Sequence, residues 1–193
     1  MTDDSVAPDG PELKDAPGPP AATRVLVAGI GNIFLGDDGF GPAVLRALNG
    51  GSIAVPPSVR CVDYGIRGMH LAYDLLEKWG GLILVDALPS RGAPGTVHVL
   101  EVDARDITEL RSTEVPRNVA QIDGHAMDPA AVFASLDALG GSLPRTLVVG
   151  CEAQTTAEGI GLSLPVEAAV PIAARKIAEL VAKLEPAGAG KEG

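Results

Sequence analysis

Residues 24–41 of the chain read RVLVAGIGNIFLGDDGFG, and this stretch decides the fold. Its first five residues form a short apolar run rich in valine, which predicts a buried strand. The glycines that follow allow a tight turn, because glycine adopts backbone conformations that other residues avoid. A helix is expected over 39–48, so the stretch predicts a strand, a glycine-rich turn and a helix in succession.

The rest of the chain repeats this alternation of strand and helix. Apolar runs and helical spacing predict strands over 59–63, 81–86, 96–101 and 146–150, and helices over 68–78, 128–139 and 165–184. The most apolar strand, 81–86, should lie centrally, whereas 96–101 alternates and should be an edge or antiparallel strand. We therefore expect one three-layer α/β domain, with a twisted, mostly parallel sheet of about five strands and helices on both faces.

The composition sets the limits of this domain and excludes several classes of protein. Residues 1–23 contain five prolines, five acidic residues and no aromatic residue, which predicts a disordered arm. Residues 185–193 should be a flexible tail, and 24–184 the folded domain. The net charge of −10 disfavours nucleic acid and anionic membranes as partners. No secretory signal or bilayer-length apolar run is present and the cysteines number two, so we expect a cytoplasmic protein.

Several carboxylates follow predicted strands, where open α/β sheets build their sites. Asp37 and Asp38 stand at the entrance of the first helix, where N-capping would use only one of them. Asp86 and Asp63 each close a strand, and burying such a charge requires a partner. Backbone N–H groups of the adjoining loops could satisfy each of these carboxylates, so a structural role and a chemical role both stay open.

His125 is the histidine best placed for chemistry, because it lies in a polar loop that leads into a predicted helix. His70 and His98 lie within a predicted helix and strand, where surface or packing roles are expected. Asp38, Asp86 and His125 together would offer two carboxylates and one imidazole. That set suits a borderline divalent metal ion with open coordination positions.

Two other kinds of site deserve comparison with this one. A dinucleotide fingerprint G-x-G-x-x-G requires a small residue where Phe34 stands, and Phe34 would block the packing of helix on strand. Cys151 follows the last predicted strand and could pair with His125 as a thiolate nucleophile. We expect instead that Cys151 and Cys61 are small packing residues.

Four segments, in this order, carry a resemblance to a known family. They read GIGNIFLGDDGFG at 29–41, ILVDA at 83–87, GHAMD at 124–128 and GLSLPV at 161–166. The chain resembles the nickel–iron hydrogenase maturation endopeptidases over nearly all of the predicted domain. In that family an acidic residue, an aspartate and a histidine bind nickel, and these fall on Asp38, Asp86 and His125.

The resemblance implies an endopeptidase, aspartic-type or metal-dependent, that cuts a C-terminal extension from a hydrogenase large-subunit precursor after nickel insertion. The substrate would bring the nickel. Nickel could polarise the scissile carbonyl or activate a water, or Asp38 could act as the general base. A non-catalytic nickel-binding assembly factor and a nucleotide-binding α/β module are the alternatives. The sequence predicts no oligomeric state.

The loop after the second strand departs from the family pattern. In the family it usually reads Asp-Gly-Gly-Thr-x-Gly and is associated with substrate recognition, whereas residues 63–68 here read DYGIRG. Tyr64 and Ile66 therefore replace a glycine and the threonine, which suggests a branch that serves a less common hydrogenase type. The residues to which the resemblance gives a role in substrate recognition are Asp63, Gly65, Ile66, Arg67 and Gly68.

Overall fold

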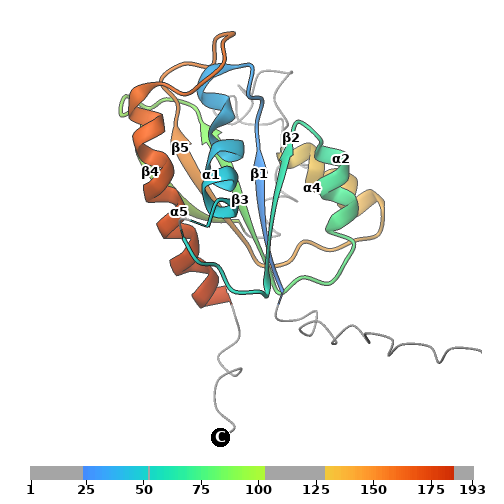
Figure 1. The fold of residues 1–193 in the computed structure, drawn as a ribbon. Helices are drawn as coiled ribbons and strands as arrows, with labels where there is room; N and C mark the ends of the chain where they lie inside the picture. Colours follow the sequence, from blue (N-terminus) through green and yellow to red (C-terminus); the bar gives the residue numbers. More distant parts are fainter. Residues whose placement is uncertain (1–23, 52, 103–128, 185–193) are drawn as a thin grey trace, which may run out of the picture.

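The computed structural model describes residues 24–51, 53–102 and 129–184, in which five strands form one sheet (Figure 1). The strands are β1 (Val25–Ile30), β2 (Val59–Gly65), β3 (Gly81–Leu88), β4 (Val97–Val102) and β5 (Thr146–Glu152). Their order is β2-β1-β3-β5-β4, with β4 antiparallel to β5 at the edge and every other pair parallel. The mostly parallel sheet, the central β3 and the antiparallel edge strand confirm the prediction.

Helices cover both faces of this sheet. They are α1 (Phe40–Asn49), α2 (Gly68–Asp74), α4 (Pro129–Ala138) and α5 (Leu164–Leu184), and a 3₁₀ turn, η2 (Gly36–Gly39), precedes α1. In Figure 1, α1 and α5 lie against one face and α2 and α4 against the other. Because side chains alternate along a strand, Val25 and Val27 pack toward α1 and α5, whereas Leu26 and Ala28 pack toward α2 and α4.

Helix α2 is shorter than the predicted helix over 68–78. It ends at Asp74, whose carbonyl accepts a hydrogen bond from Trp79 Nε1 at 2.8 Å, so the chain turns back early toward β3. The helical spacing of Met69, Ala72, Leu75 and Leu76 predicts that they share one buried face, and this is wrong for Met69 and Leu76, which are exposed. The buried residues here are Leu71, Ala72 and Leu75.

Helix α5 confirms the predicted helix over 165–184, and its apolar stripe is buried along its whole length. Within the described residues, no helix has the length and apolar character needed to cross a membrane. The expectations for the arm over 1–23 and the tail over 185–193 concern residues outside the described part of the chain.

The connections that leave the carboxyl ends of β1 and β3 run in opposite directions across the sheet. The chain passes from β1 through α1 to β2 on one side of β1, and then through α2 to β3 on its other side. Open α/β sheets bind ligands at such a switch point. The fold therefore directs attention to the residues that follow β1 and end β3.

Glycine at position 41 permits the first helix to start against these two strands. A Cβ atom there would lie 2.2 Å from the carbonyl oxygen of Ile30 and 2.5 Å from that of Val85, closer than packed atoms approach. Phe34, which stands where a dinucleotide fingerprint requires a small residue, is 61% exposed in the turn after β1. In this fold the close approach of helix to strand is made at Gly41.

Candidate active site

Asp38 and Asp86 lie at the carboxyl edge of the sheet, beside the two strands that flank the switch point. Asp38 belongs to η2, in the connection from β1 to α1. Asp86 lies in β3, one residue beyond the pairing of Gly29 with Val85. The strand continues to Leu88, so Asp86 does not close it as expected. Its Oδ1 accepts the N–H of Ala87 at 2.8 Å.

Asp38 is the more buried of these two carboxylates, with 8% of its surface exposed. Its Oδ2 accepts the backbone N–H of Asn32. Burial raises the pKa of the Asp38 carboxyl, although the hydrogen bond from Asn32 acts in the opposite direction. Gly31 has φ of +123°, and a Cβ atom there would overlap the Asp38 carbonyl oxygen at 1.9 Å. The glycine-rich turn therefore allows a partly desolvated carboxylate to sit at the site.

The third predicted ligand, His125, lies outside the described residues. Within the described residues, no three histidine, cysteine, aspartate or glutamate side chains gather closely enough to hold a metal ion. Two carboxylates of the predicted set are thus placed at one edge of the sheet. The complete set of Asp38, Asp86 and His125 stays a prediction.

Asp37 has a role that the sequence analysis missed. We considered N-capping for the Asp37–Asp38 pair, but no side chain caps η2 or α1. The Asp37 carboxylate is fully buried and accepts the N–H groups of Gln154, Thr155 and Ser163, together with the Ser163 hydroxyl. Burial raises the pKa of Asp37, but these four hydrogen bonds outweigh it, so the pKa lies below its ordinary value. Two features of the sequence could have indicated this role of Asp37: the pair of adjacent acidic residues and the GLSLPV segment, which contains Ser163.

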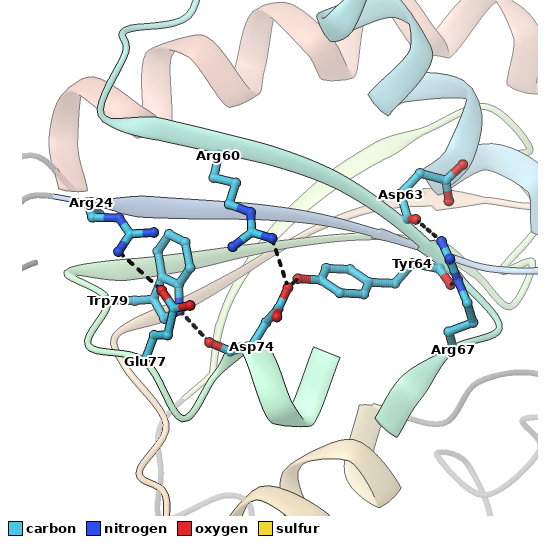
Figure 2. Close-up of polar contacts among 8 residues, drawn as sticks. All are labelled: Arg24, Arg60, Asp63, Tyr64, Arg67, Asp74, Glu77 and Trp79. Carbon is cyan, nitrogen blue, oxygen red and sulfur yellow. Dashed lines mark hydrogen bonds and ion pairs between the residues drawn. The ribbon is translucent and has the colours of Figure 1, made fainter. Parts of the chain in front are cut away.

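The loop after β2 is held by its own arginine. Arg67 folds back so that Nη2 donates to the Asp63 carbonyl at 2.6 Å and Nε donates to the Tyr64 carbonyl at 3.1 Å (Figure 2). The Asp63 carboxylate accepts the N–H of Gly65 at 3.0 Å, which is the loop-organising alternative considered above. Ile66 is 61% exposed. Beside it lies an open hollow of about 460 Å³, lined by this loop, α2 and α4.

Tyr64, one of the two departures from the family loop, points away from this loop and into the fold. It is buried under α2, where its hydroxyl donates to Asp74 Oδ2 (Figure 2). Arg60 lies 3.4 Å from the same carboxylate oxygen. Burial, and next the hydrogen bond to Asp74, raise the pKa of Tyr64. Tyr64 therefore ties β2 to α2, and Ile66 is the departure whose side chain faces outward.

The two cysteines lie as packing residues. Cys151 is fully buried in the core against α5, and burial, aided by the charge of Asp37, raises the pKa of its thiol to about 11. Cys61 is half-buried, and burial raises its thiol pKa as well. A thiol with a raised pKa is mostly protonated at neutral pH and is a poor nucleophile.

Glu152 is a second buried carboxylate that sequence reasoning did not single out. At the end of β5 it accepts the N–H groups of Arg91 and Ala93 and contacts His98 Nε2 at 2.9 Å. These contacts lower the pKa of Glu152, the bond from Arg91 contributing most. His98 thus has the structural role expected for it. His70 is exposed on α2.

Comparison with known proteins identifies the family of this chain. The family model described as hydrogenase maturation protease matches residues 44–180. The Hydrogenase 2 maturation protease of Escherichia coli is 32% identical over 156 residues, covering 80% of this chain and 88% of that protein. Coenzyme F420 hydrogenase subunit delta of Methanothermobacter thermautotrophicus is 30% identical over 164 residues, covering 82% and 94%.

A solved structure agrees with these sequence relatives. The hydrogenase maturating endopeptidase HybD from E. coli superimposes with a TM-score of 0.67 at 28% identity, covering 83% of this chain and 93% of that one. The chain belongs to the hydrogenase maturation protease family. It is accordingly a hydrolase of the peptidase class, and neither the nucleotide-binding module nor the assembly factor is favoured.

Proposed function

We propose that this protein is an endopeptidase that removes the C-terminal extension of a nickel–iron hydrogenase large-subunit precursor after nickel insertion. Family membership supports the reaction class and the substrate. The observation that carries the proposal is the position of Asp38 in the turn after β1 and of Asp86 in β3, the two strands of the switch point. In an open α/β sheet that position is where a ligand binds.

Nickel is part of the substrate in this proposal. The precursor already holds the ion, and Asp38, Asp86 and His125 add ligands from the protease. Carboxylate oxygen and imidazole nitrogen are donors that a borderline divalent ion accepts. Within the described residues the Asp38 carboxylate accepts a single hydrogen bond, from Asn32, which leaves it further acceptor capacity.

As the alternative to binding nickel, Asp38 acts as the general base, which makes the reaction aspartic-type. A water oxygen attacks the scissile carbonyl carbon while Asp38 takes up the water proton. The bond from carbon to nitrogen then breaks, and the proton passes to the departing amine. Burial raises the pKa of Asp38, and a carboxylate of higher pKa is a stronger base than an exposed one.

The loop after β2 is the proposed recognition element. Of the residues to which the family resemblance gives this role, Ile66 offers its side chain to a partner. Arg67 and Asp63 shape the loop through their hydrogen bonds within it. Gly65 supplies the tight turn, since its φ is +55°, and Gly68 is the first residue of α2.

The test is incubation of the full chain with a nickel-loaded large-subunit precursor, followed by mass spectrometry. We expect two products, the shortened large subunit and its C-terminal peptide. Stable binding of the precursor without cleavage would contradict the proposal and support the assembly factor instead.

A further inference from the structure

Residues 153–163, here called the strap, join β5 to α5 and lie along the turn between β1 and α1. In Figure 1 both segments lie at the top of the molecule. Gly159 donates its N–H to the Phe34 carbonyl at 2.9 Å, and Gly36 donates to the Gly159 carbonyl at 2.9 Å. Leu35 and Gly159 form a parallel β-bridge between the two segments. The strap is therefore paired with the same turn that carries Asp38.

The buried Asp37 carboxylate fixes the strap at its two ends. It accepts hydrogen bonds from Gln154 and Thr155 at one end and from Ser163 at the other, at 2.6 to 3.0 Å. Thr155 also accepts the backbone N–H of Asp37 at 3.0 Å. Burying a charge is costly unless it is fully hydrogen-bonded, and here the strap supplies those bonds. The strap backbone is thus held in place.

Large apolar side chains on the strap and on the paired turn are exposed to solvent. Phe34 is 61% exposed and Ile160 is 82% exposed, on either side of the Leu35–Gly159 bridge, and Ile33 beside them is 41% exposed. We call Ile33, Phe34 and Ile160 the apolar rim. Backbone pairing thus brings the segments that carry these exposed apolar side chains next to one another, as at an interaction surface.

We propose that the apolar rim binds an extended apolar segment of the hydrogenase precursor, adjacent to the scissile bond. The inference rests on the proposed function, because a chain whose scissile bond reaches Asp38 must pass the turn over 32–38. An extended chain advances about 3.3 Å per residue, so only a few residues separate the bond from the rim. Glu158 is the only charged residue of the strap, so the segment should lack acidic side chains.

Substitution of the rim tests this proposal in the full chain. The variants are Phe34→Ser and Ile160→Ser, and the matched control is Leu139→Ser, an exposed leucine just beyond the end of α4. Anisotropy of a fluorescently labelled, nickel-loaded precursor gives Kd, and cleavage followed by mass spectrometry gives KM and kcat. Thermal unfolding checks that each variant is folded.

We expect each rim variant to raise Kd and KM by about tenfold, with kcat changed less than about twofold, because it loses apolar burial on the substrate. The control should match the unsubstituted protein. Rim variants with unchanged Kd, or a control that weakens binding equally, would overturn the proposal. If the protein binds the precursor without cutting it, the proposed function fails. The Kd values of the variants then still show whether the apolar rim binds the precursor. If it does not bind at all, both proposals fail.

Discussion

At the scale of single residues, neighbouring carboxylates have opposite properties because their surroundings differ. Asp37 meets four donors, which outweigh its burial, and its pKa falls, whereas Asp38 meets one donor and burial raises its pKa. The sequence shows only two adjacent aspartates. Which of them is structural depends on a strap more than 100 residues later in the chain, and local pattern carries no information on that contact.

Asp38→Asn should separate chemistry from stability. We expect the cleavage rate to fall by at least about 100-fold, the usual contribution of a general base. The melting temperature should hold or rise at neutral pH. The reason is that a carboxyl with a raised folded-state pKa destabilises the fold wherever it is ionised. Rates and melting curves for both proteins check this, and a variant that retains full activity would exclude Asp38 as the base.

Glu152 should contribute a pH-dependent part of the stability. Its folded-state pKa is lowered, so its stabilising effect is present above the ordinary glutamate pKa and is lost as pH falls through the folded value. Glu152→Gln should therefore lower the melting temperature at pH 7 and flatten its decline below about pH 4.5. Parallel acid slopes for the two proteins would contradict this.

At the scale of elements, β2 and the loop after it have two roles: Tyr64 stabilises the fold through Asp74, and Ile66 is exposed to a partner. Tyr64→Phe removes the hydroxyl bonded to Asp74 and should cost about 1 kcal/mol of unfolding free energy, with KM unchanged. Ile66→Thr alters an exposed side chain and should leave the unfolding free energy unchanged while shifting KM for the precursor. Denaturant titration of both variants measures the unfolding free energy, and cleavage kinetics measure KM. A change of KM in the Tyr64 variant alone would reverse these assignments.

Strands and long helices followed from the sequence because their signals are local and strong. β3 is a continuous apolar run, and α5 repeats its apolar residues at helical spacing, so both could be predicted with nearly correct bounds. Helix α2 could not, since it ends through the bond from Trp79 to its last carbonyl. For the site, the rule that ligands bind at the carboxyl ends of strands predicted the positions of Asp38 and Asp86. The roles of Asp37 and Glu152 could not be predicted from local pattern, because they depend on long-range contacts.

At the scale of the whole molecule, the proposed ligand set has a consequence for how nickel is selected. Two carboxylates and one imidazole would bind copper more tightly than nickel if affinity alone decided. Selectivity is better explained if the precursor arrives with nickel already held. Asp86→Ala and His125→Ala should then weaken binding of the loaded precursor, because each removes one of the proposed nickel ligands.

Three reactions test this source of the metal: metal-free precursor, nickel-loaded precursor, and metal-free precursor with protease soaked in nickel. We expect cleavage of the loaded precursor and little in the other two. The protease alone offers only part of a coordination shell, so it should hold free nickel weakly. Mass spectrometry of the products measures each rate, and metal analysis of the soaked protease is the control. Equal cleavage in all three reactions would remove nickel from substrate recognition and leave a peptidase that reads the precursor by its polypeptide surface alone.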